Sequence, residues 1–401
     1  MKPASETHSP KSTSEAAFDK RLIHRILYTL TLLAFGILYA PQPILPALAT
    51  EFSSTSNQAA LLTTAVMLPL AIAPLSYGYI LEKVPAKKGL QLSCIIMMLC
   101  HLAFSFISSI EQAILIRAIE GMTLPIMLTS IMTLLTRTTS KEKLQKTLSI
   151  YIALTIVGGL SGRSLSMMTA EYLDWRYTFL LLAFFSLILL PLLAKLPDTK
   201  PQHAPKVRLR LLINILSHPH NRFLYPFIMI QFFIMVAILN FIPFRIMEAL
   251  NTDSYWPVFT VYSFYIAAIA TSLLTIEMRK KVTHLQFKGG IGWIIVGTIG
   301  LSCFYLNNLT MYCLGFTLCC GAIFAIHSIT STEVNSNEQT YSGLSNGTYL
   351  TFYYTGGTLG SIIPGLIIEQ ADWETTVTIL GILMLASPLL LFKYQRAAFH
   401  H

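Results

Sequence analysis

Three charged residues of this 401-residue chain lie inside long apolar segments. Arg117 and Glu120 are three residues apart in one segment, and Arg163 lies in the next. A charge in the middle of a membrane helix costs about 3 kcal/mol on insertion scales, so such residues usually face a partner or a water-filled cavity. These side chains are therefore candidates for carrying a proton or for binding an ionic solute.

The depths of these residues predict a shared site. Counted from the outer ends of their segments, Arg117, Glu120 and Arg163 lie about 9–14 Å deep at the rise of an α-helix. Gln42 lies at a similar depth in the first segment. We predict that the four side chains form one polar cluster in the outer half of the N-terminal bundle, with Arg117 and Glu120 on one helix face.

Two interpretations of this cluster stay open. In the first, Glu120 exchanges a proton, and Arg117 or Arg163 contacts the substrate or lowers the pKa that burial of Glu120 would raise. In the second, arginine and glutamate form a permanent ion pair with no role in transport. Competition between proton and substrate for one such site would couple their movements.

Other polar residues have weaker claims. Arg245 and Glu248 are three residues apart near an outer helix end, a spacing that favours a surface pair. His101 and His327 each lie alone in an apolar segment, and His327 could titrate near neutral pH, although a packing role is the commoner one for such a histidine. All six cysteines lie in apolar runs without metal-ligand spacing, so we predict no metal site.

The composition predicts an integral membrane protein. The chain is 54% hydrophobic and only 12% charged, with a mean hydropathy of +0.60, whereas soluble chains carry about 25% charged residues. The net charge of +9 does not indicate nucleic-acid binding, because the basic residues lie in loops between apolar runs. No signal-peptide pattern precedes the first run.

Each spanning helix needs about 20 apolar residues, and because irregular backbone cannot face lipid, the spans must be helices. Nearly all lysines and arginines fall in alternate loops, which predicts that both termini are cytoplasmic. The chain contains twelve candidate spans, at residues 22–48, 58–81, 89–109, 111–136, 146–169, 176–196, 223–249, 255–277, 287–306, 309–331, 343–368 and 374–394.

The chain also contains an internal repeat. Tyr151 and Tyr349 are 198 residues apart, and so are Glu171 and Glu369 and the two Asp-Trp pairs that follow. The same offset relates two glycine runs, which we expect to allow close helix packing: Gly158, Gly159 and Gly162 in the first copy, and Gly356, Gly357 and Gly360 in the second. Two similar halves in tandem are a common plan of secondary transporters.

The repeat and the loops predict four regions. Residues 1–20 form a disordered cytoplasmic tail, and residues 21–196 form the first six-helix bundle. Residues 197–221 form a cytoplasmic linker that tethers the halves and could also include a basic amphipathic helix on the membrane surface. Residues 222–398 form the second bundle.

In its motifs the chain resembles the major facilitator superfamily. That family has a loop Gly-x-Leu-Ala-Asp-Arg-x-Gly-Arg-Arg/Lys after the second helix, and residues 78–88 are similar to it. The resemblance implies a cytoplasmic gate with acid and base positions. These gate residues are Gly78, Glu82, Lys83 and Lys87, although Pro85 and Ala86 replace a glycine and a base of the family pattern.

Further motifs occur in the family's order. The fourth-helix pattern Arg-x-x-Gln-Gly appears at residues 117–121, with Glu120 in place of glutamine. Residues 39–43, which begin with Tyr39, and residues 240–245, which begin with Asn240, are similar to bacterial twelve-helix members of the arabinose-efflux and drug-exporter type. The resemblance therefore adds Tyr39 and Asn240 to the candidate site.

The resemblance implies an all-α fold of two pseudo-twofold-related six-helix bundles around a central cavity. It also implies secondary active transport of a small organic solute across a bacterial inner membrane, as proton-coupled export by a monomer without a cofactor. Transport of an anionic metabolite, including a polycarboxylate siderophore, stays open as an alternative, as does a non-transporting receptor or scaffold. The sequence has no Walker A pattern and no catalytic constellation, so neither ATP drive nor an enzyme is expected.

Overall fold

The computed structural model describes residues 13–81, 84–198, 209–218, 221–266, 270–271, 285–337 and 342–399, and all regular structure in these stretches is helical. Several predictions concern residues outside them. These are residues 1–12 of the tail, Glu82 and Lys83 of the gate, and residues 199–208 and 219–220 of the linker.

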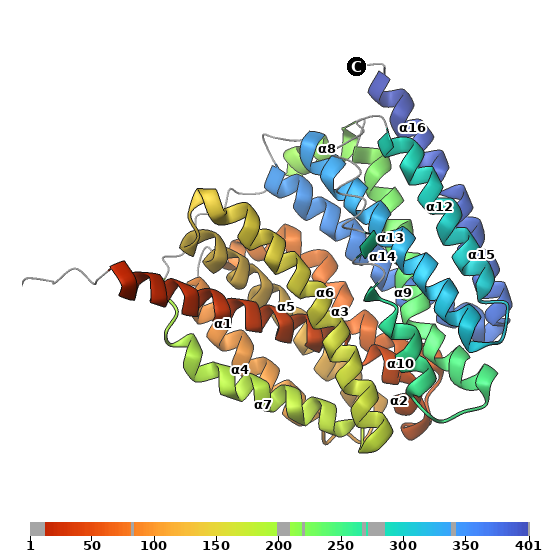
Figure 1. Cartoon of the computed structure of the whole chain (residues 1–401), viewed down its shortest axis with the longest axis horizontal. Coiled ribbons are helices and arrows are strands. Elements are labelled where there is room, and N and C mark those ends of the chain that lie inside the picture. Colours follow the sequence, from red (N-terminus) through yellow and green to blue (C-terminus); the bar gives the residue numbers. More distant parts are fainter. Residues whose placement is uncertain are drawn as a thin grey trace, which may run out of the picture.

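The first half of the chain forms a bundle (Figure 1). Its helices are α1 (Thr13–Tyr39), η1 (Gln42–Ile44), α2 (Leu45–Glu51), α3 (Ser56–Leu81), α4 (Ala86–Phe104), α5 (Ile110–Thr138), α6 (Lys141–Tyr172) and α7 (Arg176–Leu193). Because α1 begins at Thr13, residues 13–20 are helical and not part of a disordered tail. Extending an existing helix costs far less than nucleating one, and this segment contains the good helix formers Ala16 and Ala17.

The first helix is interrupted where its prolines fall. Pro41 and Pro43 have no amide hydrogen to donate, so α1 ends at Tyr39 and the chain continues through the short 3-10 helix η1 into α2. The amide of Ala40 still donates to the Gly36 carbonyl at 2.9 Å. The following carbonyls of α1 are left without partners in their own helix.

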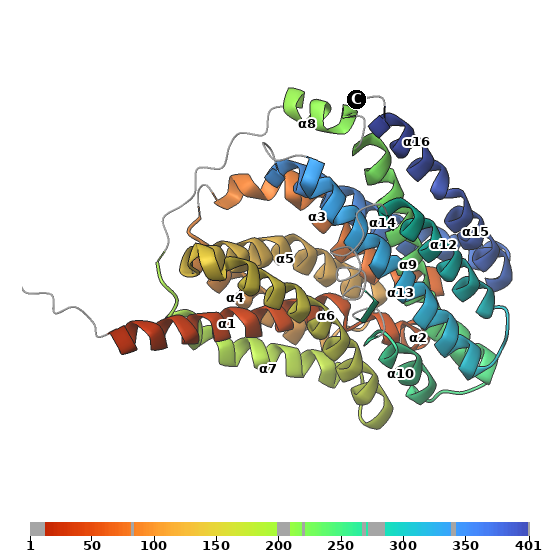
Figure 2. The same cartoon turned by 45° about the horizontal axis from the view of Figure 1, so that its top comes forward.

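The second half forms a similar group beside the first (Figures 1 and 2). Its helices are α9 (Asn221–Leu250), α10 (Trp256–Ser263), α12 (Leu285–Cys303), α13 (Leu309–Asn337), α14 (Ser342–Gln370), α15 (Trp373–Ala386) and α16 (Pro388–Phe399). Between the halves, α8 (Leu209–Ser217) forms where an amphipathic linker helix was predicted, and it packs against α9. Contact of α8 with a membrane stays a prediction.

Nine helices in the described part of the chain are long and apolar enough to cross a membrane. The predicted span 255–277 is described only in part, and the predicted span 287–306 lies on α12, whose apolar stretch Gly290–Cys303 is shorter than those nine. The predicted span 343–368 lies on α14, which contains many serine, threonine and glycine residues and is not among these nine helices. The fold is thus an all-α membrane architecture.

The repeated glycines lie at the closest helix contacts of each half. A Cβ on Gly158 would come within 2.7 Å of the Leu32 carbonyl oxygen, and one on Gly162 would overlap the backbone of Gly36, so α6 packs directly on α1. In the second half, Gly356 and Gly360 contact the backbone of Met229 and Phe233 in the same way, which brings α14 onto α9. The middle glycines face side chains instead: Gly159 faces Tyr39, and Gly357 faces Phe232 and Met67.

The two halves also share a tryptophan corner at the ends of their helices. The Trp175 ring packs edge-on against Phe104 with centroids 6.0 Å apart, and Trp373 packs against Phe304 at 6.2 Å. The Trp175 indole donates to Glu51 at 2.5 Å, and the Trp373 indole donates to the Phe304 carbonyl at 3.1 Å. The internal repeat in the sequence therefore corresponds to a repeated packing unit.

The halves meet along α3 and α14, and again at one end of the molecule. We call this end the acidic end, because its turns hold Glu51, Asp174, Asp253 and Asp372. There α6 contacts α10 through Glu171, whose carboxylate accepts from the Ser254 hydroxyl at 3.0 Å and from the Tyr255 amide at 2.6 Å. Charge-assisted hydrogen bonds of this kind are about twice as strong as neutral ones, so Glu171 fastens the two halves together here.

Replacing Glu171 with alanine should loosen this end. The substitution removes the bonds to Ser254 and Tyr255, which should raise the population with separated halves about tenfold or more. Distance distributions between spin labels at Thr50 and Thr252 would show this as a longer component. Glu369→Ala is the matched control, because Glu369 is the repeat equivalent of Glu171 and is exposed; an equal change in both variants would contradict the assignment.

Candidate functional site

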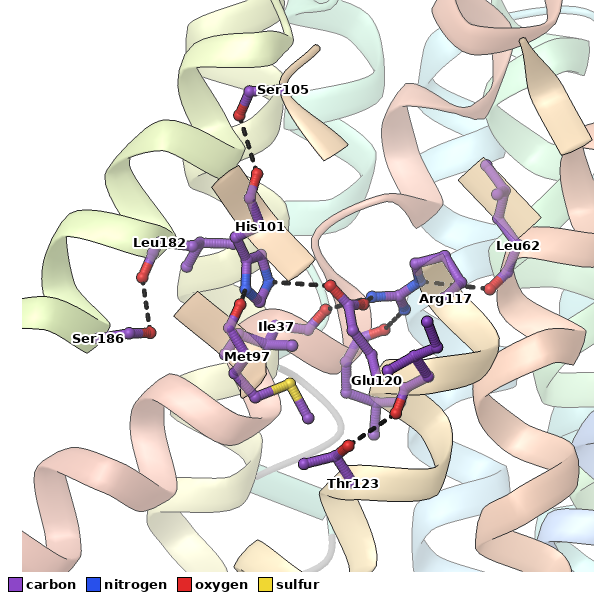
Figure 3. A network of polar contacts seen from close by, with 12 residues as sticks. Ile37, Leu62, Met97, His101, Ser105, Arg117, Glu120, Thr123, Leu182 and Ser186 are labelled. Carbon is purple, nitrogen blue, oxygen red and sulfur yellow. Dashed lines mark hydrogen bonds and ion pairs between the residues drawn. The ribbon is translucent and has the colours of Figure 1, made fainter. Parts of the chain in front are cut away.

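The predicted pair Arg117 and Glu120 forms a closed polar group inside the first half, together with His101 of α4 (Figure 3). The Arg117 Nη1 donates to Glu120 Oε2 at 2.5 Å, and His101 Nε2 lies 3.5 Å from the other carboxylate oxygen, Oε1. All three side chains are fully buried. We refer to them as the triad.

Arg117 also stabilises the interrupted end of α1. Its Nη1 donates to the Ile37 carbonyl at 3.2 Å and its Nη2 to the Leu38 carbonyl at 2.9 Å, while its Nε approaches the Leu62 carbonyl of α3 at 3.4 Å. These α1 carbonyls are among the last four of the helix, which have no amide partner in the helix itself. One guanidinium therefore holds Glu120, the end of α1 and the middle of α3.

The position of His101 determines which of its nitrogens carries a proton. Its Nδ1 lies 2.5 Å from the Met97 carbonyl, which can only accept, so Nδ1 must donate. In a neutral imidazole Nε2 then has a lone pair, and this lone pair faces the lone pairs of Glu120 Oε1. Among the described residues, neither atom has another hydrogen-bond partner. The contact becomes attractive only when one further proton lies on Nε2 or on Oε1.

A second polar group lies where the halves meet, and Arg163 is its centre. Arg163 Nε and Nη2 both donate to Gln42 Oε1, at 3.0 and 2.6 Å. The Gln42 amide in turn donates to Asn240 Oδ1 at 3.0 Å, and the Thr63 hydroxyl approaches the same oxygen at 3.2 Å. Because Asn240 belongs to α9 and the others to the first half, this chain of hydrogen bonds crosses between the halves. We call it the bridge.

Aromatic rings surround the Arg163 guanidinium. Its central carbon lies 4.3 Å from the ring centre of Tyr39, 4.9 Å from that of Tyr265 and 5.9 Å from that of Tyr262. Tyr39 comes from the end of α1, whereas Tyr262 and Tyr265 come from the second half. The predicted residues Tyr39, Gln42, Asn240 and Arg163 are therefore brought together in one place.

The single cluster predicted from the sequence is thus two groups. Arg117 and Glu120 face the interior of the first bundle, and Arg163 with Gln42 faces the second half. Within the described part of the chain, no hydrogen bond or ion pair joins the triad directly to the bridge. Depth along a helix was predicted from residue counts, but the direction in which each side chain points around its helix was not.

Within the described residues, the remaining candidates form no hydrogen bond or ion pair with either group. His327 of α13 bonds the Tyr349 hydroxyl at 2.7 Å inside the second half, with the Tyr353 ring 4.9 Å away. Arg245 lies at the acidic end, where it pairs with Glu248 at 3.1 Å, as the spacing predicted, and with Glu374 of α15 at 2.6 Å. This position ties α9 to α15.

Little of the predicted gate is described. Gly78 lies in the last turns of α3, and Glu82 and Lys83 are outside the described residues. Lys87 at the start of α4 pairs with Asp198, just beyond α7, at 3.2 Å. The gate function of these residues stays a prediction.

Sequence reasoning gave too little weight to His101 and did not find the Glu171 contact. His101 was weighed as a packing residue, although a titratable group in an apolar helix is the same signal that singled out Glu120. The partner of Glu171 is the backbone amide of Tyr255. No residue type in a sequence indicates that a backbone amide is accessible across an interface.

Comparison with known proteins supports the architecture. The profile of the Major Facilitator Superfamily matches residues 27–337. The inner membrane transport protein YnfM of Escherichia coli (strain K12) is 23% identical over 412 residues, covering 98% of this chain and 97% of that protein. The uncharacterized MFS-type transporter YybF of Bacillus subtilis (strain 168) is 24% identical over 367 residues, covering 88% of each.

Two solved structures share the fold at low identity. The nucleoside transporter NupG has a TM-score of 0.73 at 13% identity, covering 94% of this chain and 98% of that chain. A bacterial homolog of the human lysosomal transporter Spinster, crystallised in an inward-facing and unoccupied conformation, has a TM-score of 0.71 at 14% identity, covering 96% and 97%. With the family profile spanning most of the chain, this protein belongs to the major facilitator superfamily and is a membrane transporter, not an enzyme.

Proposed function

We propose that this transporter moves a small organic solute out of the cell in exchange for protons. The observation that carries the proposal is the His101–Glu120 contact, in which two buried acceptor atoms face each other at 3.5 Å and need one shared proton. We propose further that the protein acts as a monomer in a bacterial inner membrane with both termini in the cytoplasm. The E. coli relative, named an inner membrane transport protein, supports that location.

The surroundings of Glu120 suit reversible proton binding. The charged and titratable groups around it are Arg117 from its own helix, and His101 and Cys100 from α4. Without the extra proton, the positive charge of Arg117 and the negative charge of Glu120 cancel, and the triad carries no net charge. With it, the triad carries one positive charge, which is costly in a buried site. The bound proton is therefore held in a state from which it can leave when the surroundings change.

The end of α1 links the triad to the bridge. Protonation of Glu120 would weaken its ion pair with Arg117, which also holds the Ile37 and Leu38 carbonyls. A few residues later the same segment supplies Gln42, the residue that joins Arg163 to Asn240 of the second half. Proton binding in the first bundle can thereby change how firmly the halves are held together. This is the coupling that an antiporter requires.

A second candidate function is transport of an anionic metabolite, for example a polycarboxylate siderophore. One observation favours it: Arg163 is buried at the bridge, yet its Nη1 has no hydrogen-bond partner and it forms no ion pair with the described residues. An anionic group on a solute would supply the missing partner. The two candidates differ in the cargo and share the proton site.

Purified protein in sealed liposomes tests the proposal. With a pH gradient across the membrane and a pH-sensitive dye inside, addition of a transported solute should move protons in a direction opposite to the solute, and an uncoupler should abolish accumulation. Candidate solutes can first be selected by concentration-dependent thermal stabilisation. A protein that binds a solute but moves neither solute nor protons would instead be a receptor or scaffold, and the proposal would be wrong.

A further inference from the structure

We infer that Arg163 and Asn240 form the donor side of the substrate site, and that the substrate is an organic anion with a flat, aromatic-like body. This inference rests on the proposed transport function and adds to it the chemical class of the cargo. It depends on unfilled hydrogen-bond donors, on the lack of a counter-ion for Arg163 among the described residues, and on the arrangement of rings around the bridge.

Two buried donors of the bridge have no hydrogen-bond acceptor in the part of the chain that the structure describes. Arg163 donates from Nε and Nη2 to Gln42, and the two unpartnered donors are Arg163 Nη1 and Asn240 Nδ2. Both side chains are fully buried. A buried donor left unsatisfied is costly, and a buried unpaired charge is more so. These two atoms are therefore prepared for a further acceptor. The Tyr265 hydroxyl also lies beside the guanidinium, but it is neutral and cannot balance the charge of Arg163.

The charge of Arg163 indicates that this acceptor is an anion. Gln42 offers only a neutral amide oxygen, and no carboxylate of the described chain pairs with the guanidinium. In the triad, by contrast, Glu120 neutralises Arg117. A guanidinium presents its N–H groups in one plane and matches the two oxygens of a carboxylate. Carboxylate is accordingly the group we assign to the Nη1 edge.

The rings around the bridge define the rest of the ligand. Tyr39 and Tyr265 lie against the guanidinium at 4.3 and 4.9 Å. From Tyr265 a series of ring contacts continues into the second half, to Phe324 at 5.5 Å, then to His327 at 6.4 Å and Tyr353 at 4.9 Å. Such a wall favours a flat body that can stack or pack edge-on. His327, which the sequence singled out, is thus part of this aromatic wall.

Both halves contribute to the site, which is what a transported ligand requires. Arg163, Gln42 and Tyr39 come from the first half, and Asn240, Tyr265 and Tyr353 come from the second. A ligand held by both halves is sequestered when they meet at the site, and it is released when they separate on one side. The site is closed in the described conformation, since Arg163 has no exposed surface.

Ligand binding to the purified full-length protein tests the inference without requiring proton movement. The probes are benzoate, its neutral isostere benzamide, the cation benzylammonium, and acetate and citrate as anions without a ring. Benzoate should raise the melting temperature in a concentration-dependent way and bind more tightly than the other four. If benzamide binds as tightly as benzoate, or benzylammonium binds more tightly, the substrate is not an anion. If acetate or citrate binds more tightly than benzoate, the substrate does not have an aromatic-like body. No stabilisation by any carboxylate would overturn both.

Two substitutions locate the binding. Arg163→Gln should weaken benzoate binding about tenfold or more, which is the usual value of a hydrogen bond to a charged group. The control Arg176→Gln removes one positive charge at the acidic end and should leave benzoate affinity unchanged. If Arg163→Gln does not fold, Tyr353→Leu serves instead, because it should weaken benzoate binding but leave acetate binding unaltered. Unchanged benzoate affinity in the variant that folds contradicts the site, even if transport of another solute is intact.

Discussion

Glu120→Gln should give a folded protein that no longer couples solute movement to protons. Glutamine has nearly the shape of glutamate and can still accept from Arg117, but it cannot take up a proton at the contact with His101. Proton-driven flux should fall by about two orders of magnitude or more, as when a general acid–base group is removed from an enzyme. Solute exchange without a pH gradient should continue. The measurement is solute uptake and dye response in the same liposomes.

Two further variants make this result specific. Glu111→Gln replaces an exposed glutamate in the first turn of the same helix, so it should leave proton-driven flux unchanged. His101→Gln removes the other half of the proton contact and should lower coupled flux as Glu120→Gln does. Retention of proton-driven flux in Glu120→Gln would show that the triad is a permanent structural ion pair.

Arg117→Met should be the most destabilising single substitution in the first half. It leaves Glu120 buried without a cation and removes the donors to the Ile37 and Leu38 carbonyls. Breaking one partner out of a buried ion pair costs about 3–5 kcal/mol, enough to unfold many proteins. Thermal unfolding in detergent, followed by loss of monodisperse protein, measures the effect.

A second substitution separates the two causes of that loss. The double variant Arg117→Met/Glu120→Met removes the unpaired carboxylate as well, so it should recover part of the stability. The loss of stability that remains in the double variant measures how much Arg117 stabilises the end of α1. Arg176→Met is the control, because the Arg176–Glu51 pair lies near the surface and is expected to contribute about 0–1 kcal/mol. Equal stability of Arg117→Met and wild-type protein would be inconsistent with this account.

The fold could be predicted because its causes are visible along the chain. Long apolar runs require helices in a membrane, and the 198-residue offset predicts two similar halves. The glycines of the repeat lie where one helix backbone rests on another, as at Gly162 on Gly36 and at Gly360 on Phe233. Such contacts follow from residue size, which a sequence shows directly. The start of α1 at Thr13 was missed because the composition of residues 13–20 does not show that the helix following them can extend back into this segment.

For the site, the sequence predicted which residues belong to it but not how they are arranged. The costs of burial singled out Arg117, Glu120 and Arg163, yet their division into triad and bridge depends on the break in α1. Pro41 and Pro43 indicate that break, but not that its free carbonyls would take up Arg117. The unfilled Nη1 of Arg163 is likewise a property of the folded interface. Local residue types predict which groups need partners, whereas the partners themselves are set by the packing of distant helices.

Proton release on substrate binding is the most direct test of the central claim, that one proton shared by His101 and Glu120 is linked to the bridge. The purified protein is mixed with a solute identified by thermal stabilisation, in weakly buffered solution with a pH indicator. The account predicts that wild-type protein releases up to one proton per solute bound and that Glu120→Gln binds the solute without releasing any. Binding to wild-type protein without proton release at any pH, or equal release from Glu120→Gln, would contradict it.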